Sequence, residues 1–399
     1  MTAQPMEGIR VLDIATFLAA PFCGVILADF GADVVKIEQP DGGDPLRKFG
    51  TPTECNDSLV WLSEGRNKQY MTLDLRTPDG ADIFRKLVAQ SDVVLENFRP
   101  GTMEKWGLGF ESLRALNPRL VMLRISAYGQ DGPYRNKPGF ARIAHAFSGL
   151  SYLAGEKGRA PVVPGSTSIG DYVAGMWGAI GVLLALRSVE KTGLGQVIDI
   201  GLYEGIFRLM DELVPAYEKY GIVRERLGPD VAYVVPHGHW QCADGKWVAI
   251  ACSSERMFQR LAAVMGQPEL ATSAEYGTNA ARVERREAVN AIVGTWTGTL
   301  TSEAVLKACD DGDVPCGRLM AVNDIVRDPQ YQARHNFEPV ADDRVEGLVL
   351  PTQPLKLSES PARFRHAGGA LGKDTDSVLG ALLGLSSEQL AVLREAKVI

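Results

Sequence analysis

Short β-branched runs alternate with amphipathic stretches through residues 8–125, and no other feature constrains the fold of this chain as strongly. Strands are predicted at residues 10–14, 34–37, 71–75, 93–97 and 121–125, and helices at 21–30, 78–90 and 110–116. Strands that alternate with helices form a parallel sheet that helices cover on both faces. The alternation therefore predicts the α/β fold class, with a large open parallel sheet of the Rossmann-like kind.

The rest of the chain predicts a second, smaller domain inserted into the first. The next elements are predicted as helices at 140–153 and 172–189 and a strand at 196–200, then a strand at 247–250, helices at 254–265, 281–295 and 302–309, a strand at 348–350 and a helix at 387–396. We expect 1–224 to form the N-terminal part of the large α/β domain and 225–325 a smaller α+β middle domain. Residues 326–399 are expected to return to the large domain, so that both chain ends build it.

The net charge disfavours a nucleic-acid partner. The 399 residues carry a net charge of −7, whereas binding a phosphate backbone requires a basic surface. The N-terminal segment lacks the basic stretch and apolar core of a signal peptide. The longest apolar run, residues 172–186, is interrupted by three glycines and is too short to cross a bilayer comfortably. We therefore expect a cytoplasmic protein without a membrane partner.

Several familiar catalytic motifs are missing from the sequence. The segment after the first predicted strand, residues 14–21, reads IATFLAAP rather than GxGxxG, which disfavours dinucleotide binding. The patterns GxxxxGK[ST], HExxH and GxSxG are missing as well. The six cysteines form no CxxC pair, so each is either a small buried hydrophobe or a nucleophile. His237 and His239 have metal-ligand spacing, but no third ligand is evident nearby, and we predict no metal site.

Asp171 is a carboxylate in an unusual setting. It follows the small, flexible segment 164–170 and precedes the apolar helical stretch YVAGMWGAIGVLLAL. This position, at or near the helix N-cap, allows two roles. Asp is a preferred cap, because its carboxylate accepts hydrogen bonds from first-turn amides. The positive end of the helix dipole also keeps a carboxylate ionised, as a nucleophile requires.

A set of basic residues in the first domain is the second candidate feature: Arg47, Arg66, Lys68, Arg76, Arg99, Lys105 and Lys137. Arg76 and Arg99 come just after predicted strands. The carboxyl ends of parallel strands form the ligand crevice of open sheets, where cations bind polyphosphates through charge-assisted hydrogen bonds. The alternative for each residue is an ordinary place on the solvated surface.

The order of several motifs adds a resemblance to a known family. The chain reads GIRVLDIATFLAAPFCGVILADFGADVVKIEQPDGGDPLR, then RNKQYMTLDLRTPDG, VVLENFRPGTMEKWGLGFESLRALNPRLVMLRISAYGQDGPYRNKPGF, GDYVAG and TGLGQVIDIGLYEG. It resembles the family III CoA-transferases, which include formyl-CoA:oxalate and carnitine CoA-transferases and the related 2-methylacyl-CoA racemases. The resemblance covers nearly the whole chain and is weakest through about 205–300.

The resemblance implies a nucleophile, a ligand and a partner. It assigns the nucleophile to Asp171, in the GDYVAG motif, and CoA contacts to Leu73, Arg76, Asn97, Phe98, Arg99, Lys105 and Lys137. It implies that CoA moves from an acyl-CoA to a small carboxylic acid through an aspartyl-CoA thioester, with CoA and acyl-CoA as substrates and no tightly bound cofactor. It also implies a homodimer in which two chains interlock.

Two departures from the family pattern bear on the reaction. Phe140 stands where the racemases carry a proton-transferring His, which disfavours a racemase. Ala141 stands where transferases often carry an acid, and His145 either substitutes for that acid or packs within its helix. A 2-methylacyl-CoA racemase or epimerase that uses Asp171 for proton transfer, and a catalytically silent CoA-binding protein, stay open as alternatives.

The donor and acceptor acids are not predicted by these motifs. Candidates for the pocket lining are Phe17, Leu18, Phe140, Tyr172 and the segment 237–239. Except for that segment, each is equally well explained as a core residue. If His237 or His239 reaches the pocket, we expect a dicarboxylate acceptor.

Overall fold

The computed structural model describes residues 3–399, which form two compact units. The first unit comprises Met1–Leu150, Val163–Glu212 and Arg334–Ile399, and the second comprises Ser151–Val162 and Leu213–Ala333. Both ends of the chain thus belong to one unit. The predicted domain bounds at residues 224 and 325 stay a prediction, because compactness does not by itself define an independently folding domain.

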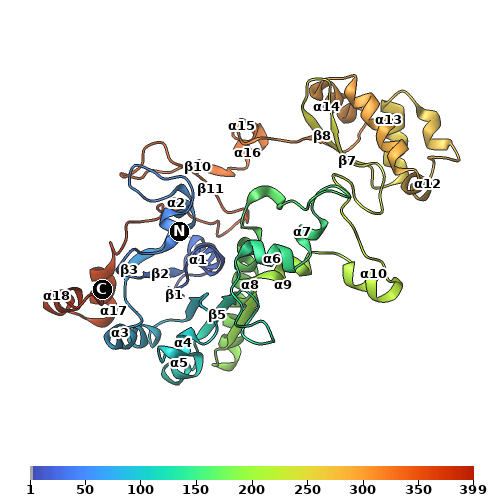
Figure 1. The fold of residues 1–399 in the computed structure, drawn as a ribbon. Coiled ribbons are helices and arrows are strands. Elements are labelled where there is room, and N and C mark those ends of the chain that lie inside the picture. Colours follow the sequence, from blue (N-terminus) through green and yellow to red (C-terminus); the bar gives the residue numbers. More distant parts are fainter. Residues whose placement is uncertain (1–2) are drawn as a thin grey trace. The chain divides into compact units, whose positions relative to one another are not determined.

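A six-stranded parallel sheet forms the centre of the first unit (Figure 1). Its strands are β1 (Arg10–Asp13), β2 (Asp33–Glu38), β3 (Gln69–Thr72), β4 (Val93–Glu96), β5 (Val121–Ser126) and β6 (Val197–Gly201). The order in the sheet is β3-β2-β1-β4-β5-β6. The predicted α/β fold class is confirmed. The strand order reverses between β1 and β4, and at such a switch point an open parallel sheet forms a crevice beyond its carboxyl ends.

Helices cover both faces of this sheet. Successive residues of a strand point to opposite sides, so both faces carry apolar side chains that the helices bury. The first face is covered by α1 (Ala19–Asp29), α8 (Ile169–Thr192) and α9 (Leu202–Arg208), and the second by α3 (Pro78–Val88), α5 (Phe110–Leu116), α17 (Thr375–Leu383) and α18 (Ser387–Glu395). Val11 and Val93 pack into the core of the first face, whereas Leu12 and Val94 pack into the second. Strands buried on both faces have nearly continuous apolar sequences, and these strands have that pattern.

The remaining elements of the first unit are short. They are η1 (Pro45–Lys48), α2 (Leu59–Glu64), α4 (Thr102–Lys105), α6 (Ala141–Phe147), η2 (Pro164–Ser166) and the antiparallel pair β10 (Phe337–Pro339) and β11 (Val349–Pro351). A further helix, α7 (Leu150–Leu153), begins at the last residue of one segment of this unit and continues into the second unit.

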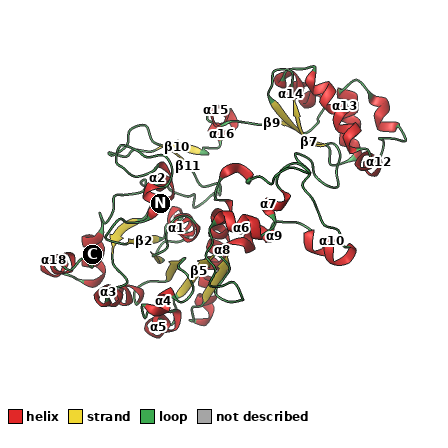
Figure 2. Ribbon diagram, viewed as in Figure 1, coloured by secondary structure: helices red, strands yellow, loops and turns green. Residues whose placement is uncertain are grey.

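The second unit combines a small antiparallel sheet with helices (Figure 2). Its elements are β7 (His237–Gln241), β8 (Trp247–Ala251), β9 (Cys316–Arg318), α10 (Leu213–Tyr220), α11 (Glu255–Val264), η3 (Pro268–Thr272), α12 (Asn279–Glu284), α13 (Arg286–Gly298), α14 (Ser302–Asp311), α15 (Val322–Ile325) and α16 (Pro329–Ala333). Trp240, Val248 and Val293 are buried in its own hydrophobic core.

Two predicted helices are divided in the structure. The helix predicted at 140–153 is broken into α6 and α7, because Gly149 adopts a φ of 93°, which ends an α-helix. The helix predicted at 281–295 is divided at Arg285, whose φ/ψ of −110° and 29° is not helical. The strand predicted at 348–350 is β11, which lies in the first unit and pairs with β10.

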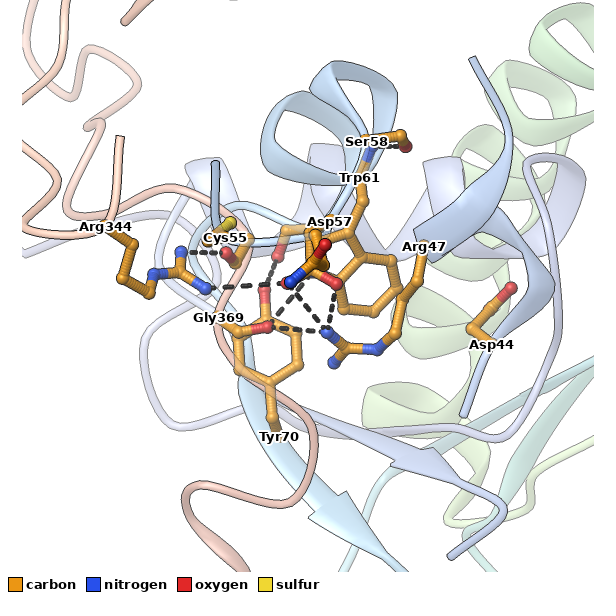
Figure 3. Close-up of polar contacts among 12 residues, drawn as sticks. Asp44, Arg47, Cys55, Asp57, Ser58, Trp61, Tyr70, Arg344 and Gly369 are labelled. Atoms are coloured by element: carbon orange, nitrogen blue, oxygen red, sulfur yellow. Dashed lines mark hydrogen bonds and ion pairs between the residues drawn. The ribbon is translucent and has the colours of Figure 1, made fainter. Parts of the chain in front are cut away.

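Arg47 joins the two ends of the chain inside the first unit (Figure 3). Its Nε lies 2.7 Å from the Glu38 carboxylate, and its Nη1 donates to the Gly369 carbonyl at 3.1 Å. The Trp61 indole stacks 3.9 Å from the guanidinium carbon and donates from Nε1 to the same carbonyl. Because Arg47 is buried, these contacts fix the returning C-terminal segment against the first elements of the chain.

Helix α8 is longer than the apolar run 172–186 suggested. It has 24 residues, and by length and composition it is the one helix within residues 3–399 that would be able to span a membrane. One side of it packs against α1 and the strands β5 and β6. Core helices of water-soluble proteins pass the same test of length and apolarity.

Candidate active site

A cavity of about 460 Å³ lies at the carboxyl ends of β1, β4 and β5, in the first unit. It is lined by Thr16, Phe17, Leu18, Ala19, Phe49, Asn97, Ile125, Ser126, Ala127, Gly139, Phe140, Ala141, Arg142, His145, Val163, Thr167, Ser168, Asp171 and Leu202. The cavity therefore occupies the switch point of the strand order, where open α/β sheets bind their ligands.

Two hydrogen bonds join the loops that follow β1 and β4. The Thr16 amide donates to Asn97 Oδ1 at 2.9 Å, and Asn97 Nδ2 donates to the Thr16 carbonyl at 2.7 Å. The next amide, that of Phe17, donates to Asp44 Oδ1 at 3.0 Å, and Phe17 has a φ of 60°. A bulky residue rarely adopts this backbone conformation, so the hydrogen bonds hold the Phe17 loop in a strained shape at the cavity wall.

Asp171 is the third residue of α8 rather than its cap. The N-cap is Ser168, whose carbonyl accepts a hydrogen bond from the Asp171 amide at 3.0 Å. The predicted capping role of Asp171 is therefore wrong, because Ile169 and Gly170 are already helical. Its carboxylate stays in the first turn, near the positive end of the helix dipole, and lines the cavity.

The surroundings of Asp171 make its carboxyl group less acidic than usual. Burial raises its pKa to about 6, and a hydrogen bond with the Ser168 side chain opposes the rise. The group is still mostly ionised at neutral pH, and a carboxylate with a raised pKa is a stronger nucleophile and base than an exposed one.

His145 supports the start of α8 from α6. The Gly170 amide donates to His145 Nε2 at 3.0 Å, and burial lowers the pKa of the imidazole, with Arg142 adding to the effect. The ring is therefore neutral and carries its proton on Nδ1, for which the described residues offer no acceptor. Its observed contact is structural, since it satisfies a first-turn amide of the helix that carries Asp171.

The residues predicted to bind CoA fall into two groups. Asn97 lines the cavity of Asp171, while Leu73 and Phe98 line a second, smaller cavity of about 40 Å³ at the ends of β3 and β4. Thr16 lines both cavities, so the two lie next to each other across the carboxyl edge of the sheet.

The four predicted basic contacts lie outside both cavities. Arg76, Arg99, Lys105 and Lys137 are exposed. Arg76 is held by the Asp74 carboxylate through two hydrogen bonds, and Lys137 Nζ lies 3.6 Å from the centre of the Tyr134 ring. All four side chains extend into solvent, where long side chains are able to reorient toward a phosphate.

Three other basic residues of the sequence analysis are excluded as ligand contacts. Arg47, Arg66 and Lys68 are buried and paired with carboxylates of their own unit, Arg66 with Asp29 and Lys68 with Asp13, each at 2.8 Å. The prediction that they bind phosphate or lie on the surface was wrong. Buried charges require partners inside the protein, and these guanidinium and ammonium groups already have them.

Only some of the residues predicted to line the pocket line the cavity. Phe17, Leu18 and Phe140 line the cavity, whereas Tyr172 packs edge-on against Phe22 with ring centres 4.8 Å apart. The segment 237–239 belongs to β7 of the second unit. Among the described residues, no cysteine lines the cavity.

The motifs did not indicate several lining residues, among them Thr16, Phe49 and Arg142. The sequence positions of Thr16 and Arg142 could have indicated them. Thr16 comes shortly after β1 and therefore lies at the carboxyl edge of the sheet, and Arg142 is three residues before His145 on the same helix face. Phe49 is brought in by the 3₁₀-helix η1 and has no such signal.

Comparison with known proteins identifies the group to which this chain is related. The family model described as CoA-transferase family III matches residues 6–375. Sequences of two subunits of one enzyme match almost the whole chain. The succinyl-CoA–L-malate CoA-transferase beta subunit of Chloroflexus aurantiacus is 52% identical, covering 100% of this chain and 99% of its own. The alpha subunit is 50% identical, covering 99% of this chain and 92% of its own.

The chain belongs to CoA-transferase family III. It is therefore an enzyme of the CoA-transferase class, as the motifs predict. A solved CAIB/BAIF family protein from Brucella suis supports the fold: it superposes with a TM-score of 0.84 at 30% identity, covering 96% of this chain and 100% of its own. CoA thioesters and carboxylic acids are the substrates of this class.

Proposed function

We propose that this chain transfers CoA from an acyl-CoA to a carboxylic acid through a thioester on Asp171. The observation that carries the proposal is a carboxylate with a pKa of about 6, placed at the start of α8 in the wall of the switch-point cavity. The cavity offers room for an acyl group, and the first turn of α8 provides a positive dipole. The same carboxylate lies in the motif that carries the nucleophile in the family.

The proposed reaction exchanges one thioester for another in balanced steps. The Asp171 carboxylate attacks the acyl carbon of the donor, forming a mixed anhydride and releasing the CoA thiolate. The thiolate attacks the aspartyl carbonyl, releasing the donor acid and leaving an aspartyl-CoA thioester. The acceptor carboxylate attacks this thioester, and the released thiolate then takes the acceptor acyl group, which regenerates Asp171. No net proton or external energy source is needed.

CoA binding is proposed along the carboxyl edge of the sheet. The smaller cavity of Leu73 and Phe98 adjoins the cavity of Asp171 through Thr16, which offers a path for the pantetheine arm. Phe98 packs against Trp106 with ring centres 5.2 Å apart and adds an apolar surface. Arg76, Arg99, Lys105 and Lys137 are proposed contacts for the phosphates, and CoA is a substrate rather than a resident cofactor.

The proposed donor is succinyl-CoA and the proposed acceptor is malate. These are the acids in the names of the two Chloroflexus subunits, which are 52% and 50% identical to this chain over nearly its whole length. Racemase chemistry is less well supported, because it requires two proton-transferring groups. Besides Asp171, the ionisable imidazole of this cavity is that of His145, whose Nε2 is occupied by the Gly170 amide.

A homodimer is proposed for the whole molecule. One face of α8 exposes Met176, Ile180, Leu183 and Leu184. These residues lie at helical spacing and form a contiguous apolar strip, and such strips mark protein interfaces. Because the relatives are named as alpha and beta subunits, a dimer with a second, similar chain is the alternative.

The test compares two Asp→Asn variants in the first turn of two helices. Asp171→Asn removes the proposed nucleophile, while Asp79→Asn changes an exposed residue in the first turn of α3. We expect transfer from succinyl-CoA to malate to fall by a factor on the order of 10⁴ in Asp171→Asn and to stay at the wild-type rate in Asp79→Asn. Equal rates in wild type and Asp171→Asn would exclude the proposal.

A second measurement separates the racemase. The wild-type enzyme is incubated with a 2-methylacyl-CoA in deuterium oxide, without an acceptor acid. Deuterium at C2 of the acyl group would support proton transfer and contradict the transferase. The proposal expects the acyl group to keep its hydrogen.

A further inference from the structure

We propose that Arg142 binds the second carboxylate of a dicarboxylic acyl group and thereby selects dicarboxylic acids as substrates. This inference rests on the proposed function, since it assumes that the acyl group reacts at Asp171 in the same cavity. It names a specificity-determining residue that the motifs of the chain do not assign.

Arg142 is a cation that the folded chain does not neutralise. It is the second residue of α6 and lines the cavity together with Asp171. No hydrogen bond, ion pair or ring contact holds its guanidinium among residues 3–399. By contrast, Arg47, Arg66 and Arg124 are each paired with carboxylates.

The position of Arg142 on α6 costs stability rather than adding to it. A positive charge in the first turn of a helix is opposed by the helix dipole, and the first turn of α6 holds no acidic residue that would compensate. The Arg142 side chain is exposed and also lines the cavity, so its guanidinium is open both to solvent and to a ligand there. An anionic ligand in the cavity would remove this unfavourable charge.

The charges of the cavity also change during the proposed reaction. The cavity lining holds one carboxylate, that of Asp171, and one guanidinium, that of Arg142. When Asp171 carries CoA as a thioester, its negative charge is lost. The charge of Arg142 then makes the lining of the cavity net positive. A dicarboxylate acceptor then places one carboxylate at the thioester and the other at Arg142. No ion pair joins the two side chains in the described structure, so Arg142 is available to a ligand.

The apolar wall of the cavity strengthens this contact. Phe17 lies edge-on to both Phe49 and Phe140, with ring centres 6.1 Å apart in each pair. Phe49 and Phe140 keep 50% and 70% of their surface exposed, so these rings form an apolar rim that the chain of a bound acyl group would cover. Covering the rim would shield a carboxylate–guanidinium pair from water and strengthen it.

The experiment uses two acceptor acids that share a chain length, succinate and butyrate. The full-length wild type, Arg142→Met and Arg142→Lys are compared, and Arg119→Met serves as the control. Arg119 is exposed, lies just before β5 at the opposite edge of the sheet and does not line the cavity. Both acids are supplied together with one acyl-CoA donor, and the two CoA products are measured by mass spectrometry.

We expect the succinate-to-butyrate ratio to fall about 30-fold or more in Arg142→Met, mainly through a higher KM for succinate. Arg142→Lys keeps the charge but loses the bidentate geometry, so it should restore the ratio in part. Arg119→Met should keep the wild-type ratio. Thermal unfolding of each variant shows whether it is folded.

The outcomes separate this inference from the proposed function. If wild type forms no aspartyl-CoA with any donor, the proposed function fails and the inference fails with it. If wild type forms the thioester but Arg142→Met keeps the wild-type ratio, only the assignment of Arg142 is overturned. A wild type that prefers butyrate to succinate would also overturn it.

Discussion

The Asp171 carboxyl group is ionised at neutral pH and is also more basic than that of an exposed aspartate. It is ionised at neutral pH, yet burial raises its pKa to about 6, well above that of an exposed aspartate. The first turn of α8 and the Ser168 hydrogen bond keep the carboxylate charged, while the apolar surroundings make it reactive. This balance is what a nucleophilic carboxylate requires, because a fully solvated one is too weak a nucleophile.

The raised pKa predicts the pH dependence of the donor half-reaction. Only the carboxylate form of Asp171 attacks the thioester, so kcat/KM for the acyl-CoA should fall about tenfold per pH unit below about pH 6. Above that pH it should be constant until other groups titrate. A steady-state pH profile with saturating acceptor measures this decrease in kcat/KM. A midpoint near pH 4, typical of an exposed aspartate, would contradict the environment described for Asp171.

The same shift predicts a stability effect of Asp171→Asn. The folded chain binds the proton more tightly than the unfolded chain, so this stabilising contribution is complete below about pH 4 and is lost as the pH rises through about 6. Asparagine stays neutral throughout. We expect the variant to gain about 1–2 kcal/mol in the free energy of unfolding at pH 7 and little at pH 4. Urea denaturation at both pH values tests this, and equal gains would contradict it.

At the scale of elements, the crossing of α1 and α8 positions the nucleophile. A Cβ at Gly175 would lie 2.5 Å from the Ala19 carbonyl oxygen and 3.1 Å from Phe22. The two helix backbones therefore approach more closely than any other residue would allow. Ala19 also lines the cavity, so a displacement of α8 moves both Asp171 and the wall opposite.

Gly175→Ala should accordingly harm both stability and binding. We expect a loss of about 1–3 kcal/mol from overpacking and a higher KM for the donor. Gly298→Ala is the matched control, because a Cβ there meets nothing within 4 Å at the end of α13. The control should be neutral or stabilising by up to about 1 kcal/mol. Chemical denaturation and initial rates give both values. A Gly175→Ala protein as stable as the control would show that α1 and α8 separate readily.

The element pattern was predictable wherever periodicity and turn residues agreed. Strands β1, β4 and β5 and helix α5 lie within one residue of their predicted positions, because buried parallel strands are continuous apolar runs and α5 ends before Asn117-Pro118. Predictions failed where a single backbone angle decided the outcome, as at Gly149 and Arg285. Such angles depend on tertiary contacts rather than on local propensity.

The candidate site was predictable in part. The family resemblance indicated Asn97 and Phe98, which line the two cavities, and the small residues before Asp171 indicated a helix start. The burial of Arg47, Arg66 and Lys68 was not predictable, because each is paired with a carboxylate distant in sequence or in another element. Arg142 belongs to no motif, and its only sequence signal is its position three residues before His145 on the same helix face.

At the scale of the whole molecule, α8 has two different faces. One is buried against the sheet and α1, and the other exposes a strip of Met176, Ile180, Leu183 and Leu184, the last with 67% of its surface accessible. An exposed apolar strip on the helix that carries Asp171 is unfavourable in an isolated chain. A second chain that covers it would stabilise both the helix and the site.

A charged residue introduced into this apolar strip should therefore weaken the association of two chains. We expect the wild type to sediment as a dimer and Leu184→Asp to shift it toward the monomer with reduced activity. Leu116→Asp is the control, because Leu116 is a similarly exposed apolar residue at the end of α5. Analytical ultracentrifugation over a range of concentrations measures the change. A wild type that stays monomeric, and dimerises only with a second, similar chain, would replace the homodimer with a heterodimer.

The most direct test of the account is a mass measurement on Asp171. Wild type and Asp171→Asn are mixed with succinyl-CoA, quenched in acid before the acceptor is added, and digested for peptide mapping. We predict that the wild-type peptide containing Asp171 gains the mass of CoA less one water and that hydroxylamine converts this adduct to a hydroxamate at Asp171. Asp171→Asn should carry no adduct. An adduct on any other residue, or CoA transfer by the variant at the wild-type rate, would contradict covalent catalysis by Asp171.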